Sequence, residues 1–128
     1  MKYLLLAVMT CSCMLAFGQS DLLNSTRSWT SVENIDLYSG QTFQNTFQIS
    51  IDTATLTLTN EGIARNFQVD NISGSWPALN QEGQLTFDLV IHDFRGTGIV
   101  KNEAGIISVT IDFSQRKDGM KKKFIVNN

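Results

Sequence analysis

The sequence predicts an all-β fold, a single domain built as an antiparallel meander of about eight strands. Nearly every segment after the first twenty residues alternates apolar and polar residues with the period of two that a half-buried strand shows. No segment keeps a helical spacing for more than a turn or two. Short stretches rich in Gly, Asn and Asp separate the segments, and such short links join antiparallel neighbours, because parallel neighbours need long crossovers.

The expected elements follow in chain order. Asp21 to Asn24 is expected to form one helical turn, whose Leu22 and Leu23 close an end of the core. Strands are expected over residues 27–37, 42–51, 54–59, 63–70, 84–93, 97–102, 106–115 and 120–126. Turns are expected at Ser39-Gly40, Asp52-Thr53, Asn60-Glu61-Gly62, Arg95-Gly96, 102–105 and Asp118-Gly119, and the lone long connection at 71–83.

Between residues 43 and 60 the alternation changes phase at Asp52 and Thr53: apolar residues occupy odd positions before it and even positions after it. A two-residue turn keeps the apolar face continuous across a chain reversal. It predicts the pairs Ile51 with Ala54, Ile49 with Leu56 and Phe47 with Leu58. The alternative is a β-bulge in one long strand, which the reluctance of Thr53 to adopt a positive φ favours.

The last two strands allow the same test of register. A two-residue turn at Asp118-Gly119 brings apolar residues opposite apolar residues on one face and a polar pair together on the other. It predicts the pairs Phe113 with Phe124, Ile111 with Val126 and Ser114 with Lys123.

Eight short strands with one apolar face each close into a barrel or split into two packed sheets. The sequential order favours a small up-and-down barrel, since closure removes exposed edges, and a two-sheet β-sandwich is the alternative. Lipocalin-like and fatty-acid-binding barrels have this organisation, and Ser28-Trp29-Thr30-Ser31 resembles the early tryptophan of lipocalins. Ser28 stands where the lipocalin pattern has a spaced glycine, and no second motif follows. The resemblance therefore concerns architecture, and no family is assigned.

The first eighteen residues are expected to be a secretory signal peptide, which leaves residues 19–128 as the single domain. Lys2 is a short positive region, Tyr3 to Leu15 an apolar stretch, and Ala16-Phe17-Gly18 a cleavage site. The stretch is short for a stable membrane span. Both cysteines lie inside it, and lipidation there is the less favoured alternative, so the domain is expected to lack disulfides. This suits a secreted or periplasmic bacterial protein.

The composition argues against several classes of function. The chain has a formal net charge of −2, whereas a nucleic-acid binder needs an excess of basic residues. The single histidine, His92, shares a strand face with Asp88, but no nucleophile or second acid accompanies them, so we expect no catalysis. Metal binding needs three or four convergent ligands. We expect neither a metal nor a cofactor.

Three residues are candidates for a binding site. Arg65 interrupts the apolar face of Ile63, Phe67 and Val69, and on the strand expected to pair with it Asn45 lies between two phenylalanines. An arginine inside an apolar barrel suits a ligand with a carboxylate head; alternatively, Arg65 lies near the rim and extends into water. Trp76, in the long connection, is a candidate contact residue or a cap over the end of the barrel.

The sequence therefore favours an exported, non-catalytic barrel that binds a small apolar ligand with a polar or anionic head. The alternative is a protein-interaction or inhibitor module with a filled core, because small eight-stranded barrels are just wide enough for side chains. Six phenylalanines are bulky enough to fill such an interior: Phe43, Phe47, Phe67, Phe87, Phe113 and Phe124.

Overall fold

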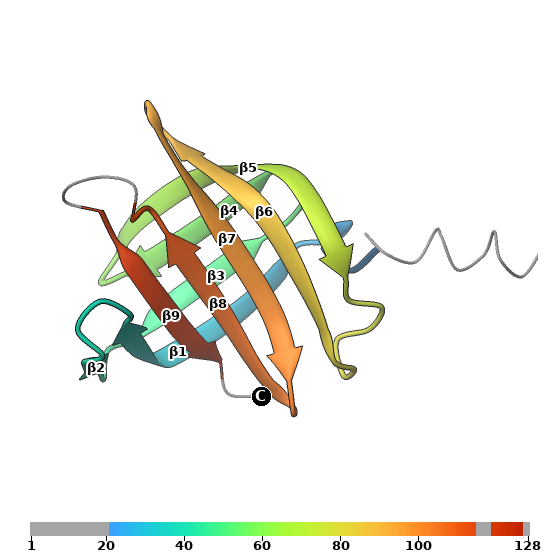
Figure 1. The fold of residues 1–128 in the computed structure, drawn as a ribbon, viewed down its shortest axis with the longest axis horizontal. Coiled ribbons are helices and arrows are strands. Elements are labelled where there is room, and N and C mark those ends of the chain that lie inside the picture. The colour runs from blue at the N-terminus through green and yellow to red at the C-terminus, as the bar shows by residue number, and fades with distance from the viewer. Residues whose placement is uncertain (1–20, 115–118, 127–128) are drawn as a thin grey trace, which may run out of the picture.

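The computed structural model describes residues 21–114 and 119–126, in which nine strands and one short 3-10 helix form (Figure 1). The predicted signal peptide, residues 1–18, lies outside the described residues. The elements are η1 (Asp21–Leu23), β1 (Arg27–Asp36), β2 (Thr42–Phe43), β3 (Phe47–Ile51), β4 (Thr55–Asn60), β5 (Ile63–Ser75), β6 (Gly83–Ile91), β7 (Phe94–Glu103), β8 (Ile106–Asp112) and β9 (Lys121–Val126).

The strands close into a barrel. Strands β3 to β9 pair antiparallel in chain order, and β1 pairs with both β3 and β9. Eight of the described strands thereby complete the barrel, and β2 is an extra strand attached to β1. The predicted closed barrel is confirmed, and the two-sheet alternative is not formed, since the described strands join one continuous sheet.

Closure depends on a change of partner halfway along β1. Residues 27–31 pair with β3, and residues 31–36 pair with β9. Ser31 belongs to both ladders, opposite Phe47 and opposite Val126. The register shifts between Ser31 and Glu33, and this bulge leaves Val32 exposed while Asn34 is buried.

The inward-facing residues of the strands form one apolar core, as the alternating pattern requires. Its largest fully buried side chains come from η1, from strands β3, β4 and β6 to β9, and from the loop after β5. They are Trp76, Phe87, Phe124, Leu23, Ile49, Ile51, Leu56, Leu85, Leu89, Ile107, Ile111 and Val100. A narrow barrel is therefore filled by its own side chains over much of its length.

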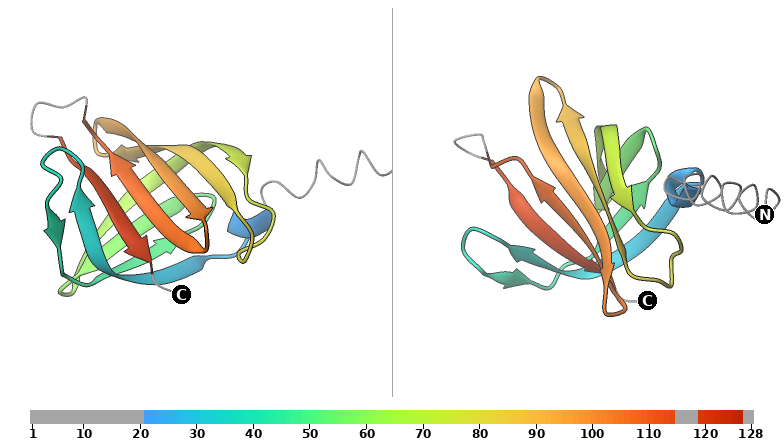
Figure 2. Two further views of the ribbon diagram at one scale, coloured as in Figure 1. Left: turned by 60° about the horizontal axis from the view of Figure 1, so that its bottom comes forward. Right: turned by 45° about the vertical axis from the view of Figure 1, so that its right-hand side comes forward.

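One end of the barrel is closed by η1 and by the loop after β5. Figure 2 shows η1 beside this loop in both views. Leu22 and Leu23 are buried, as predicted, and Nε of Arg27 donates to the carbonyl of Leu22 over 2.9 Å. The rings of Trp29 and Trp76 stack with centroids 6.2 Å apart. These residues close this end with apolar surface.

Two glycines in β7 make room for aromatic rings. A Cβ atom at Gly98 would overlap the ring of Phe87, its neighbour on β6, and one at Gly96 would overlap Phe113. The glycines thus allow the rings to lie flat against the backbone of β7. The predicted turn at Arg95-Gly96 is wrong for the same reason: Gly96 is a strand residue, and the chain turns at His92 and Asp93.

The chain reverses at Asp52, as the phase change predicted, but the turn is longer than expected. The main-chain N–H of Asp52 donates to the carbonyl of Thr55, and Oδ1 of Asp52 accepts from the N–H groups of residues 54 and 55. Ile51 therefore lies opposite Leu56 and Ile49 opposite Leu58, a shift of two residues from the predicted pairs. An even shift keeps every apolar side chain on the inner face.

The predicted register of the last hairpin is also wrong by an even number of residues. Val109 lies opposite Phe124, and Ile107 lies opposite Val126. The N–H of Phe113 donates to the carbonyl of Met120, so the connection is wider than a two-residue turn. Residues 115–118, and with them part of the predicted turn, lie outside the described residues.

Further boundaries differ from the prediction: the strand expected at 97–102 begins at Phe94, and the one expected at 106–115 ends at Asp112. Residues 42–51 form two strands, β2 and β3, rather than one, because residues 44–46 leave the ladder. The expected long connection is shorter than residues 71–83, because β5 continues to Ser75 past a register shift between Asp70 and Ser73. Asn71, in this irregular stretch, has a φ of 54°. Asparagine tolerates that conformation better than most residues.

We predict that Gly98→Ala lowers the free energy of unfolding by about 1–3 kcal/mol, because the added methyl group displaces the ring of Phe87. Chemical denaturation measures the change. The Phe87→Leu variant and the double variant complete a cycle, in which Gly98→Ala costs much less once the ring is absent. Equal costs in both backgrounds would contradict the packing described for β6 and β7.

Candidate functional site

The end of the barrel away from η1 is open and holds two adjoining cavities. The larger, about 820 Å³, lies between residues 64–68 of β5 and the tip of the β6–β7 hairpin, with Phe113 and Met120 on its far wall. The smaller, about 290 Å³, is enclosed by β3, β4, β5 and β9. Arg65 and Met120 line both. We call this end, with both cavities, the open end.

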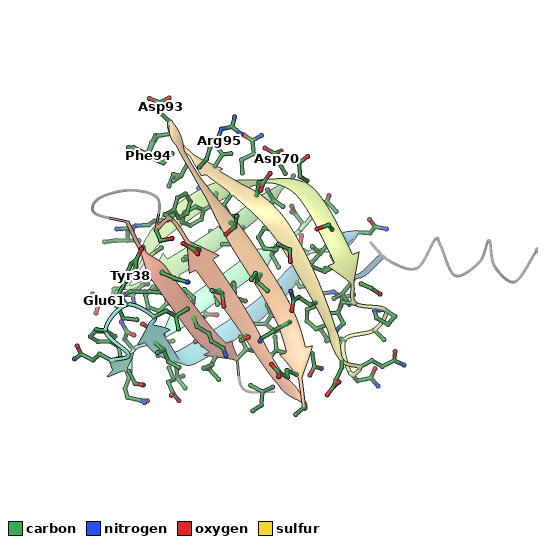
Figure 3. The ribbon with its side chains drawn as sticks, in the orientation of Figure 1. Tyr38, Glu61, Asp70, Asp93, Phe94 and Arg95 are labelled. Atoms are coloured by element: carbon green, nitrogen blue, oxygen red, sulfur yellow. The ribbon has the colours of Figure 1, made fainter. Side chains whose placement is uncertain are left out.

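The larger cavity exists because β5 extends past the end of β6. The ladder between these strands begins at Gln68, opposite Val90, and β6 ends at Ile91. The β6–β7 hairpin projects beyond the neighbouring strands (Figure 1). Figure 3 shows Phe94 and Arg95 leaving the hairpin in opposite directions, and Phe94 lines the cavity.

The smaller cavity combines an apolar floor with charged side chains at its rim. Phe47, Leu58 and Phe124 contribute apolar surface, and the rings of Phe47 and Phe124 meet edge to face with centroids 4.9 Å apart. Arg65 and Lys122 are the cationic residues among those that line it, and Glu61 is the acidic one. Its volume of about 290 Å³ is just below the range of ordinary ligand sites, which is about 300–1,000 Å³.

Arg65 lies near the rim of the barrel, which is the second of the two positions that the sequence allowed. It occupies an inward-facing position of β5, directly opposite the buried Leu58 on β4. Its side chain is exposed, because this part of β5 is at the open end. Among the described residues, no ion pair or side-chain hydrogen bond is formed by Arg65. Its guanidinium group is thus available to an anion that enters the open end.

Lys122 is oriented by the extra strand. Its Nζ lies 5.4 Å from the centroid of the Phe43 ring, which belongs to β2. A cation over an aromatic face is favourable by about 0.5–1 kcal/mol at an exposed site. Strand β2 is not needed to close the barrel. It places the ring of Phe43 beside Lys122 at the open end.

Asn45 does not lie beside Arg65. The expectation that the two residues sit on paired strands is wrong, because β5 pairs with β4 and β6, and Asn45 lies in the break between β2 and β3. Oδ1 of Asn45 accepts a hydrogen bond from Nδ2 of the buried Asn34. The side chain of Asn45 therefore binds Asn34, just after the bulge in β1.

Trp76 closes the end of the barrel opposite the cavities, where its side chain is fully buried. Its Nε1 donates to the carbonyl of Gln81 over 3.0 Å. The loop itself is fixed to the β7–β8 hairpin, since Nδ2 of Asn102 donates to the carbonyl of Leu79. This position corresponds to a cap over the barrel end, and it is remote from the open end.

His92 and Asp88 do not form the pair that a shared strand face implied. His92 is a turn residue with a φ of 53°, and Asp88 accepts from Nδ2 of Asn71 over 2.8 Å. Within residues 21–114 and 119–126, no group of three or more His, Cys, Asp or Glu side chains could hold a metal ion. No helix in the same part of the chain is long and apolar enough to cross a membrane.

Asp112 ends β8 next to the wall of the open end. Burial raises the pKa of its carboxyl group, but hydrogen bonds from Ser114 and the positive charge of Lys121 outweigh this, so the pKa lies below its ordinary value. The N–H of Ser114 donates to Oδ1 over 2.8 Å, and Nζ of Lys121 lies 3.8 Å from Oδ2. These contacts hold the two ends of the β8–β9 connection together.

Sequence reasoning missed Lys122 and Met120 at the open end. The register of β9 shows why: Lys122 shares the inward-facing parity of Phe124 and Val126, which the alternating pattern of residues 120–126 already contains. A lysine at an inward-facing position near the start of the predicted strand could have indicated a cation at the barrel rim. That Met120 faces Arg65 across the cavities depends on closure between β1 and β9, which no local pattern reveals.

Comparison with protein-family models, with curated proteins and with solved structures gives no match to this chain. The fold and the site define a small closed β-barrel with one capped end and one open, cationic end.

We predict that Asp112→Asn lowers stability at pH 7 by about 1 kcal/mol or less, as for other partly exposed ion pairs. Because folding lowers the pKa of this carboxyl group, its contribution is present above the ordinary value of 3.8 and is lost as the pH falls through the folded-state pKa. Thermal unfolding of both proteins from pH 7 to pH 2 should show the difference vanish at the acid end. A constant difference would contradict the assignment.

We also predict that Trp76→Ala destabilises the protein by about 3–5 kcal/mol, because it removes the largest buried side chain of the capped end. Trp76→Phe keeps the ring stack with Trp29 but loses the bond to Gln81, and we expect a cost of about 1 kcal/mol from that bond, plus a packing cost. Urea denaturation measures both. A loss below about 1 kcal/mol for Trp76→Ala would show that the indole is not a structural cap.

Proposed function

We propose that this protein is a non-catalytic binding protein whose open end holds a small ligand with an apolar body and an anionic head. The observation that carries the proposal is Arg65, which occupies an inward-facing position opposite Leu58 and has no ion pair among the described residues. Two cavities adjoin it, and both apolar and polar side chains line them. The exposed guanidinium group of Arg65 has the planar geometry that binds a carboxylate with two parallel hydrogen bonds.

The distribution of filled and open space supports the same function. The core between the capped end and the middle of the barrel is packed with buried side chains, and the larger cavity of the described residues lies at the open end. The larger cavity has a volume within the range of ordinary ligand sites, which is about 300–1,000 Å³. A filled core and a bound ligand are therefore compatible in this barrel.

We propose further that the protein works outside the cytoplasm, in the periplasm or in the medium. The support is the pattern of the first eighteen residues, a positive start, an apolar stretch and a small-residue cleavage site. The absence of cysteine after residue 13 fits a barrel that is stabilised by its apolar core alone.

Native mass spectrometry of the protein purified from an exporting host, with the denatured mass as control, tests the proposal, and titration with dodecanoate gives an affinity. We expect Arg65→Leu to weaken dodecanoate binding about 10- to 100-fold, the usual effect of losing a charge-assisted hydrogen bond.

Arg95→Leu is the matched control, because Arg95 lies outside both cavities of the open end and points away from Phe94. It should leave the affinity for dodecanoate unchanged. Equal affinity in the wild type and in Arg65→Leu would rule out the proposed head-group site.

A further inference from the structure

One stretch of β5 has a free backbone edge at the open end. Residues 63–67 pair with β4, but on the other side the ladder with β6 starts only at Gln68. Within the described part of the chain, no strand covers this edge. The larger cavity follows it, since five consecutive residues of β5, 64–68, line that cavity.

The register identifies which main-chain groups point to the free edge. The N–H of Val69 donates to the carbonyl of Ala54, so the odd residues of β5 direct their main-chain groups toward β4. Hydrogen-bonded and non-hydrogen-bonded pairs alternate along an antiparallel ladder. Ala64 and Asn66 therefore present their N–H and C=O groups to the larger cavity.

The protein covers the corresponding edge of β1 with a strand of its own. The half of β1 that pairs with β9 has left β3, and β2 occupies the vacated side through two pairs, Asn34 with Phe43 and Ile35 with Thr42. The edge of β5 at the open end receives no such strand from the described residues. Among the described residues, an unpaired edge of the kind that β2 covers on β1 is therefore uncovered on β5.

Charge lies at one end of this edge. Ile63, where β5 begins, lines the smaller cavity together with two cations, Arg65 and Lys122, and one acidic residue, Glu61. A strand added antiparallel to β5 runs from the Phe67 side toward Ile63, so its last residue arrives at these two cations. Its inward side chains would face Arg65 and Phe67 and the apolar wall of Phe113 and Met120.

We propose that the ligand is an extended peptide that adds to the free edge of β5 and places its C-terminal carboxylate between Arg65 and Lys122. The inference rests on the proposed function and specifies its ligand class. Backbone pairing with Ala64 and Asn66 supplies affinity, as in other cases of strand addition, and the cations select a free C-terminus. A hydrocarbon chain has no groups that could pair with Ala64 and Asn66.

Amide hydrogen exchange, followed by NMR on the wild-type protein, tests the proposal with acetyl-Val-Thr-Val-Thr-Val as the probe. In the free protein the amides of Ala64 and Asn66 should exchange fast, and saturating peptide should slow both by at least about tenfold. Arg65 and Phe67 donate toward β4 and serve as internal controls. Unchanged exchange at Ala64 and Asn66 with bound peptide would overturn the proposal.

The same peptide with an amidated C-terminus should bind about tenfold or more weakly, and Lys122→Gln should reduce this discrimination. Ala64→Pro removes one edge donor and should weaken peptide binding, whereas Ala64→Val retains the donor and should not. If Ala64→Pro fails to fold, the exchange measurement on the wild type decides.

The two proposals fail separately. If dodecanoate binds in an Arg65-dependent way and the peptide does not bind, the peptide proposal is wrong and the proposed function stands. If neither probe binds, both are wrong. Equal affinity for the acid and the amide of the peptide would overturn the assignment of the cations to a C-terminus.

Discussion

The pairing of β1 with two partners is the interaction on which the rest of the structure depends. Without the ladder between residues 31–36 and β9, the sheet would have two free outer strands and its apolar face would meet water. The bulge after Ser31 lets one strand serve both neighbours, because it bends the chain and restores the inward direction at Asn34. The cost is local: Oδ1 of Asn34 is buried without a hydrogen-bond donor among the described residues. The ladder that closes the barrel therefore also buries the Oδ1 atom of Asn34.

Closure of eight strands also decides where a ligand can be held. A barrel of this width is filled by side chains, and the rings of Phe87 and Phe124 with the aliphatic residues around them occupy its centre. In the described part of the chain, the larger cavity lies where neighbouring strands end at different heights, as β5 and β6 do. Of the basic residues at that end, Lys122 is half-buried, and Arg65 is exposed beside the apolar residues of the cavities. The fold therefore determines the site. The offset between the ends of β5 and β6 creates both the larger cavity and the unpaired backbone of β5.

The sequence predicted the fold class, the closed barrel, the inner-facing residues and the helical turn before β1, because these depend on alternation, which is local. It placed one register two residues and another four residues away from those observed, at Asp52 and before Met120. Even errors of this kind leave every side chain on its proper face, so the pattern could not reveal them. The turn at His92 was not predicted, because the sequence suggested a turn at Gly96. Gly96 is instead a strand residue that leaves room for the ring of Phe113. Of the site, Arg65 was identified from its own strand, whereas Lys122 and the separation of Asn45 from Arg65 depend on which strands meet.

The position of the closing ladder has a consequence for the order in which the protein can acquire its structure. Strand β1 is the first strand and β9 the last, so their pairing joins the two most distant strands of the described chain. Hairpins from β3 to β8 join strands that are close in sequence, so they can form early. The β1–β9 ladder closes the longest loop and therefore loses the most chain entropy. A chain leaving a ribosome lacks β9 until the residues after β8 emerge. Until that moment β1 has a partner on one side only, and the barrel stays an open sheet whose apolar face needs shielding.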